Sequence, residues 1–204
     1  NLIIAASIFD KLVAQLQKEG GHLATPEQKE MLRKAMWDGE RHRTVETVAI
    51  APQQLAKIAG FEIPADRKFI MVHGDGIGKE HHFSGEKLTT LLALYKYESF
   101  DQALAMMRGV YEVGGKGHSC GIYSFDQDHI HRLAMAAPVS RIMVRQPQSK
   151  ANAGAFNNGM PMTSSLGCGT WGGNIISENV HLKHYLNTTW VSVPIKEDKP
   201  SDEE

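Results

Sequence analysis

The sequence has little of several features that would assign it to a particular class. Only two cysteines, Cys120 and Cys168, occur among 204 residues, which is too few for a disulfide framework and favours a reducing, cytoplasmic setting. We find no run of 18 apolar residues and no secretory signal segment, so we expect no membrane span and no membrane partner. The formal net charge is −1, which excludes the strong basic field that attracts nucleic acid.

A methionine is also missing from the start. The first residue is Asn1, an apolar segment follows at once, and the sequence stops in the charged stretch KEDKPSDEE. We therefore expect a piece of a longer polypeptide.

Polar capping residues predict where the helices begin. Hydrophobic residues make up 42% and charged residues 22%, enough for one globular domain with a sizeable core. Thr25-Pro-Glu-Gln28 has the capping-box pattern, and Ser7, Ser99 and Asp126 precede further stretches of helical spacing. These helices should end near Gly20, Trp37, Gly114 and Pro138, and a shorter helix is expected over 53–59.

Short apolar runs between the helices predict strands that are covered on both faces. Strand and helix alternate from residue 91 to 144, which is typical of a parallel sheet with right-handed crossovers. The fold class is therefore α/β, with a largely parallel sheet and flanking helices. The expected strands are 69–72, 91–95, 121–125, 142–144 and 190–193.

The glycine-rich stretch LGCGTWGG, at 166–173, has the spacing G-x-G-x-x-G of a dinucleotide-binding turn. Such a fingerprint also needs a strand before it, a helix after it and an acidic residue about 20 positions further on. None of these is indicated here. We interpret the stretch as a tight loop in a long irregular region over 146–180, and GDGIGK at 74–79 as a surface turn.

Neither cysteine has the sequence context of a nucleophile. No base adjoins Cys168, and residues two apart on a strand, such as His118 and Cys120, do not make the contact of a Cys–His pair. We expect a structural thiol at Cys168 and a buried small residue at Cys120. Histidine pairs such as His181 and His184 lack cysteine or carboxylate partners at zinc-ligand spacing, so no metal is expected.

Glu86 and His118 each precede a predicted strand. If those strands are parallel neighbours, both side chains emerge at one edge of the sheet. An acid or base and an acceptor for sugar hydroxyls would then act side by side.

Four segments, in this order, resemble the CoA-acylating branch of the aldehyde dehydrogenase superfamily. They are FSGEKLTTLLALYK, GGKGHSCGIYS, RIMVRQP and SSLGCGTWGGNIISENVHLKHYLN. The resemblance covers nearly the whole chain but only the C-terminal portion of the family's longer polypeptide. The stretch over 141–169 is most similar to the acylating sulfoacetaldehyde dehydrogenases.

The resemblance implies an activity and a domain organisation. A cysteine attacks an aldehyde, NAD or NADP takes the hydride, and coenzyme A releases the acyl group as a thioester. That cysteine would lie upstream of Asn1, so the chain alone should be inactive. A truncated catalytic domain is implied over 1–180, and over 181–204 an oligomerisation strand with a polar tail, in a homodimer or homotetramer.

The resemblance also implies site residues. Glu86 matches the carboxylate that contacts the nicotinamide ribose, and His118 matches a histidine near the reacting thioester. Ser164 and Ser165 belong to the loop that would shape the aldehyde pocket. Arg145 stands where many relatives have Asn, and it either grips an anionic aldehyde through a bidentate contact or makes a structural ion pair.

Two alternatives stay open. The enzyme would instead oxidise acetaldehyde or succinate semialdehyde to its acyl-CoA, or the chain would serve only as an assembly module. The sequence does not decide between NAD and NADP, because the residues that decide it lie in a domain that the sequence lacks.

Overall fold

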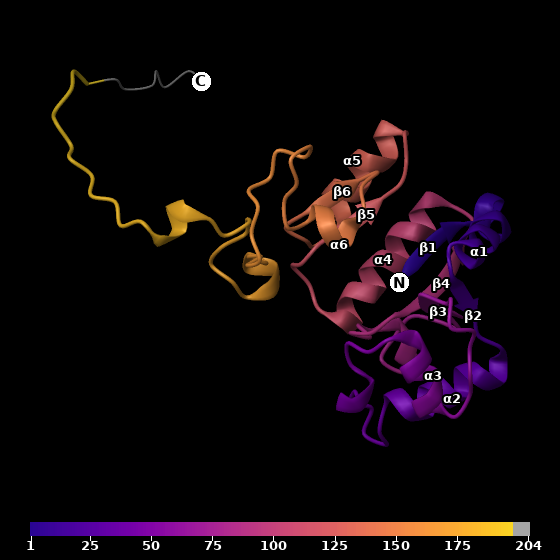
Figure 1. Cartoon of the computed structure of the whole chain (residues 1–204). Coiled ribbons are helices and arrows are strands. Elements are labelled where there is room, and N and C mark those ends of the chain that lie inside the picture. Colours follow the sequence, from indigo (N-terminus) through magenta and orange to yellow (C-terminus); the bar gives the residue numbers. More distant parts are fainter. Residues whose placement is uncertain (198–204) are drawn as a thin grey trace.

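The main sheet is parallel throughout. The computed structural model describes residues 1–197, and in it four strands follow the order β1 (Leu2–Ala5), β4 (Leu91–Tyr97), β3 (Phe69–His73) and β2 (Gly21–Leu23) (Figure 1). Every neighbouring pair runs in the same direction. The prediction of an α/β fold with a largely parallel sheet is confirmed.

The two central strands carry apolar side chains on both faces. Along β3, Ile70 and Val72 pack on one side while Met71 packs on the other, and all three are fully buried. This follows from the period of two of a strand, in which successive side chains point to opposite faces. Layers of helix cover both faces, which explains why the apolar run is continuous instead of alternating.

Helices α2 (Pro26–Met36) and α3 (Pro52–Ala59) cover one face of the sheet, and α1 (Phe9–Lys18) covers the other. Thr25 forms the predicted capping box with Gln28 before α2. The predicted cap at Ser7 is wrong: Ser7 lies in a short 3-10 turn, and Ile8 precedes α1 without a side-chain cap.

Two of the strands were not predicted. β1 is four residues of the apolar N-terminal segment, and β2 is the tripeptide Gly21-His-Leu, which has no apolar run to reveal it. Gly21 is required there because a Cβ atom would lie 2.7 Å from Met71 Cε and 2.8 Å from Leu16 O. Gly21, directly after the predicted helix end at Gly20, therefore begins a strand packed tightly against β3.

The expectation of a single sheet through residues 91–144 is wrong. β5 (Cys120–Ile122) and β6 (Ile142–Val144) form a separate two-stranded parallel sheet. The physical reason is that β4 already has β1 on one side and β3 on the other, so β5 has no free edge there. β5 also ends earlier than the predicted limit of residue 125.

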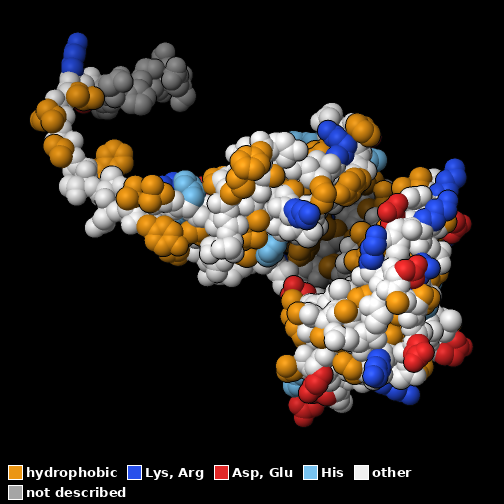
Figure 2. Space-filling view, viewed as in Figure 1, with side chains coloured by type: hydrophobic (Ala, Val, Ile, Leu, Met, Phe, Trp, Pro, Cys, Tyr) orange, Lys and Arg blue, Asp and Glu red, His pale blue; other side chains and the backbone are white. Residues whose placement is uncertain are grey.

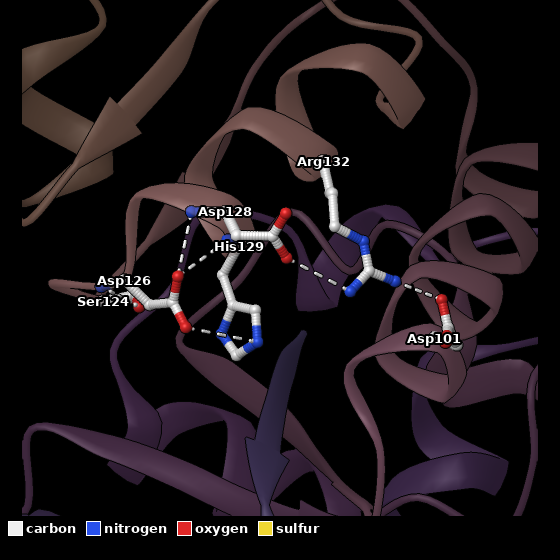
Figure 3. A network of polar contacts seen from close by, with 6 residues as sticks. All are labelled: Asp101, Ser124, Asp126, Asp128, His129 and Arg132. Atoms are coloured by element: carbon white, nitrogen blue, oxygen red, sulfur yellow. Dashed lines mark hydrogen bonds and ion pairs between the residues drawn. The ribbon is translucent and has the colours of Figure 1, made fainter.

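Helices α4 (Phe100–Gly114) and α5 (Gln127–Ala136) pack together and cover this second sheet. The predicted cap at Asp126 is confirmed: its carboxylate accepts hydrogen bonds from the backbone N–H of Asp128 and His129 (Figure 3). Arg132 of α5 donates to Asp128 and to Asp101 of α4. This surface network joins the starts of the two helices.

After the short helix α6 (Gln148–Ala151), the chain is mainly irregular and ends in an extended arm (Figure 1). The predicted strand over 190–193 is absent from the single chain, because residues 187–197 lie apart from every strand that would pair with them. The apolar side chains of the arm stay exposed (Figure 2). Within residues 1–197, no helix is both long enough and apolar enough to cross a bilayer.

Candidate functional site

Glu86 is presented by the loop between β3 and β4, and its side chain is exposed. Within residues 1–197, its carboxylate makes no hydrogen bond or ion pair. A carboxylate of this kind is free to accept hydrogen bonds from a bound molecule.

Lys87 holds this loop from the interior of the protein. Its side chain is 5% exposed, and Nζ donates to the carbonyl oxygens of Phe83 (2.9 Å) and Gly85 (2.8 Å) and to Asn1 Oδ1 (2.7 Å). Burial, assisted by the nearby charge of Arg43, lowers the pKa of Lys87 to about 8. The ammonium is therefore held in place by three oxygen acceptors but destabilised by the loss of water.

Arg43 holds the same loop from the other side. Its guanidinium donates to the carbonyl oxygen of Lys87 through Nε (3.2 Å) and Nη2 (2.9 Å), and lies 4.9 Å from the centre of the Trp37 ring. Ala49 N donates to Leu88 O at 2.8 Å. Glu86 is thus exposed on a loop whose flanking residues are fixed.

His118 lies just before β5, and its ring is exposed. We expected Glu86 and His118 to lie close together because each precedes a strand and these strands would be neighbours. This reason is wrong, because β4 and β5 lie in different sheets. The loop of Glu86 lies instead next to the end of α4. A Cβ atom on Gly114 would lie 3.6 Å from Glu86 N, and His118 follows Gly114 by four residues.

Arg141 is a buried residue of the candidate site that sequence reasoning missed. Its guanidinium is 5% exposed and donates to Asn179 Oδ1 (2.6 Å), Gly167 O (2.7 Å) and His118 O (3.2 Å). The available signal was an arginine at the head of the apolar strand β6, where a charge is buried only with partners. Arg141 thus joins the segment of His118 to the glycine-rich loop and to the S-E-N-V motif at 177–180.

The loop over 164–180 folds back on itself as an antiparallel ladder. Val180 N donates to Ser165 O (3.0 Å) and Gly167 N to Glu178 O (3.1 Å). Asn179, 2% exposed, donates from Nδ2 to the carbonyl oxygens of Asn152 and Pro161, as well as accepting from Arg141. The side chains of Ser164 and Ser165 are exposed on this ladder.

The glycine-rich stretch is a docking loop and not a dinucleotide turn. No strand precedes it, and only the three-residue 3-10 turn Thr170–Gly172 follows. A Cβ atom on Gly117 would lie 2.7 Å from Cys168 Cβ and 2.8 Å from Gly172 N, and Gly117 has a φ of 105°. These glycines let the loop pack against the backbone next to His118.

The cysteines carry no sign of activation. Within residues 1–197, no histidine contacts Cys168 Sγ, whose one polar contact is Leu166 O at 4.0 Å. Cys120 is partly buried and packs against the core under α4 and α5, and burial raises the pKa of its thiol to about 11. A thiol in that state is a poor nucleophile at neutral pH.

Arg145 and His118 lie at opposite ends of the second sheet, because His118 precedes β5 and Arg145 follows β6, which runs parallel to β5. The backbone N–H of Arg145 donates to Ile122 O, and its φ is 53°. Its guanidinium donates to Ser124 O at 2.7 Å and lies 4.7 Å from the centre of the Phe125 ring. No carboxylate pairs with it within residues 1–197, so the structural ion pair that we weighed is not formed.

The expectation that His181 and His184 lack a carboxylate partner is wrong. Glu178 lies with His181 and His184, and the ligand atoms of the three residues lie within 4.8 Å of one another. Glu178 Oε1 also makes contacts within the protein: His184 Nε2 lies 3.2 Å and Lys183 Nζ 2.7 Å from it. His181 N donates to His184 Nδ1 at 2.9 Å. The cluster is explained as a hydrogen-bonded turn after the S-E-N-V motif.

The fold and these segments are similar to those of a solved acetylating aldehyde dehydrogenase. The solved structure of an acetylating aldehyde dehydrogenase from Geobacillus thermoglucosidasius matches with a TM-score of 0.90 and 32% identity, over 98% of this chain and 44% of that one. This confirms the resemblance to the CoA-acylating branch that the motifs indicated, and with it the fold class.

Within that branch the chain is similar to sulfoacetaldehyde dehydrogenases. The protein from an Acholeplasma species is 38% identical over 208 residues, which take in 100% of this chain and 43% of the relative. The acylating enzyme from Bilophila wadsworthia is 36% identical over 95% of this chain and 43% of its own length. The chain thus spans less than half the length of these relatives, and no family model matches it.

Lys87 should make the stability of the protein depend on pH. A lysine whose folded pKa is about 8, against an ordinary value of 10.5, releases its proton first in the folded state, so stability rises with pH between these values. We expect the free energy of unfolding to gain about 1 kcal/mol from this residue between pH 8 and 9.

Urea unfolding of the protein and of its Lys87→Met variant at both pH values measures the gain as a difference. The subtraction removes the opposite contribution of Cys120, whose pKa is raised and which therefore loses stability as pH rises. Equal pH dependence of the two proteins would show that Lys87 is not buried as a charge.

Proposed function

We propose that this chain is part of an NAD(P)-dependent, CoA-acylating aldehyde dehydrogenase that oxidises an aldehyde to its acyl-CoA through a cysteine thioester. The observation that carries the proposal is the junction at Arg141, a buried side chain that joins three of the four segments resembling that branch: its own segment, that of His118, and that of Gly167 and Asn179. His118, which is exposed, takes part in this junction through its carbonyl oxygen, and Glu86, whose carboxylate is free within residues 1–197, lies on a loop that packs beside the end of α4.

Glu86 suits the role of holding the nicotinamide cofactor. Its carboxylate is free and exposed, and the loop that carries it is fixed by Lys87 and Arg43. It would accept hydrogen bonds from ribose hydroxyls. When bound, the cofactor supplies the hydride acceptor, and Glu86 would orient the ribose toward the reacting carbon.

The nucleophilic cysteine and the rest of the cofactor site are proposed to lie upstream of Asn1. Asn1 bonds to Lys87 through Oδ1 and to Ser84 O through Nδ2, so residues that precede it would enter beside the loop of Glu86. His118 would then face the thioester and the thiol of coenzyme A. The chain alone, without that cysteine, would be catalytically inactive.

The proposed substrate is sulfoacetaldehyde, with acetaldehyde and succinate semialdehyde as alternatives. Ser164 and Ser165 are exposed on the ladder that packs beside His118, and their hydroxyls would bind the aldehyde's polar end. Arg145 has an exposed guanidinium without a carboxylate partner in residues 1–197, which suits an anion. Because Arg145 lies at the opposite end of the strands from His118, we propose Ser164 and Ser165 as substrate contacts in preference to Arg145.

The extended arm suits assembly with a second copy of the chain. Trp190, Val191 and Val193 are 91%, 84% and 72% exposed, and a strand requires a neighbour to satisfy its backbone. We propose that residues 190–193 add to a sheet of a neighbouring subunit in a homodimer or homotetramer. A monomer in solution would contradict this proposal.

His118 is the first residue to test. In the complete enzyme, His118→Gln should lower kcat for thioester formation by about 100-fold, the usual loss when a positioned acid or base is removed. Steady-state assay of NAD(P) reduction with sulfoacetaldehyde and coenzyme A measures it. His131→Gln, which changes an exposed histidine on α5, is the matched control. Unchanged kcat in His118→Gln would remove this residue from the mechanism.

The substrate is tested by comparing kcat/KM for sulfoacetaldehyde, acetaldehyde and succinate semialdehyde. We expect the sulfonate to be preferred. If Arg145 contributes, Arg145→Ala raises KM about tenfold for sulfoacetaldehyde, the loss of one charged hydrogen bond, and leaves KM for acetaldehyde unchanged. Equal changes for both aldehydes would exclude Arg145 as a substrate contact.

A further inference from the structure

Ser119, next to His118, is a buried hydroxyl at the centre of a hydrogen-bond network. It is 6% exposed. Its Oγ atom lies 2.7 Å from His118 Nδ1, 3.1 Å from Gln148 Nε2 and 3.4 Å from Asn152 Nδ2. A serine hydroxyl has one proton to donate and two lone pairs that accept, so the direction of each bond can be assigned.

The amide of Gln148 fixes the first direction. Its Nε2 atom lies 3.0 Å from the carbonyl oxygen of Ser119 as well as 3.1 Å from Oγ. A carbonyl oxygen only accepts, so the atom that faces it is the amide nitrogen and not the amide oxygen. Gln148 therefore donates to Ser119 Oγ.

The remaining bonds follow. Asn152 Nδ2 donates to the second lone pair of Ser119 Oγ, which leaves the hydroxyl proton for the shortest contact, His118 Nδ1. An imidazole nitrogen that accepts a hydrogen bond carries no proton. In neutral His118 the proton then resides on Nε2, the ring nitrogen for which residues 1–197 provide no hydrogen-bond partner.

We propose that Ser119, held by Gln148 and Asn152, is a positioning residue that sets neutral His118 in the tautomer with its proton on Nε2. This inference rests on the proposed function and narrows the role of His118 within it. A neutral Nε2–H offers a hydrogen bond to an oxygen of the substrate, whereas a base acting through Nε2 would need the opposite tautomer.

The tautomer is measured by NMR of the complete protein labelled with 15N-histidine, at a pH where His118 is neutral. Comparison with His118→Gln identifies the signals of His118. We expect an unprotonated Nδ1 and a protonated Nε2. In Ser119→Ala the ratio of the two tautomers should fall by about tenfold, the effect of losing one hydrogen bond, and Ser119→Thr should restore it.

Ser140→Ala is the matched control, because Ser140 Oγ is buried and has no hydrogen-bond partner within residues 1–197. It should leave the tautomer of His118 unchanged. A proton on Nδ1 in the unaltered protein would overturn the proposal, and so would an unchanged tautomer ratio in Ser119→Ala. If the tautomer is as proposed but His118→Gln keeps its full kcat, the proposed catalytic role fails while the assignment of Ser119 stands.

Discussion

The arrangement of the candidate site depends on one buried guanidinium, that of Arg141. A charge removed from water is costly unless polar groups replace the lost hydration. Here three oxygens do so, and they come from residues 118, 167 and 179. Burial still lowers the pKa of Arg141, which shows that its acceptors replace water only in part. Within residues 1–197, Arg141 is the one donor to Asn179 Oδ1. Its three hydrogen bonds add to the backbone ladder and to the packing of Gly117 against Cys168, which also hold these segments together.

Two independent supports therefore position the proposed catalytic groups. The parallel sheet and the pair Lys87 and Arg43 fix the loop of Glu86, while Arg141 fixes the segment of His118 and the loop that docks on it. The end of α4 connects the two supports, since Gly114 packs beside Glu86 and leads into the segment of His118. Through Ser119, the same segment also sets which ring nitrogen of neutral His118 carries the proton.

Much of the fold was predictable because local chemistry determines it. The capping residues Thr25, Ser99 and Asp126 begin their helices as expected, and the buried strands β3, β4 and β6 lie where apolar runs indicated them. The division into two sheets was not predictable, because it depends on which strands occupy the edges of β4. Strand β2, the tripeptide Gly21-His-Leu, was missed for a related reason: its contacts with β3 are set by tertiary packing.

The candidate site was predictable in part. Motifs that resemble those of a known branch indicated Glu86 and His118, but Arg141, Ser119 and Asn179 act through contacts between residues far apart in the sequence. The carboxylate partner of His184 was missed because Glu178 reaches it across a turn. Spacing rules describe helices and strands, and they give little information about a loop that folds back on itself.

Hydrogen exchange of Arg141→Met tests the central role of Arg141 most directly, because Met preserves much of the apolar volume and removes every donor. Mass spectrometry should show faster exchange at the ladder amides of Gly167, Gly169 and Val180, with the amide of Ile70 in the main sheet still protected. Arg132→Met, which removes a surface arginine, should leave all four amides unchanged. Undiminished protection of the ladder amides in Arg141→Met would contradict the conclusion that Arg141 holds the site together.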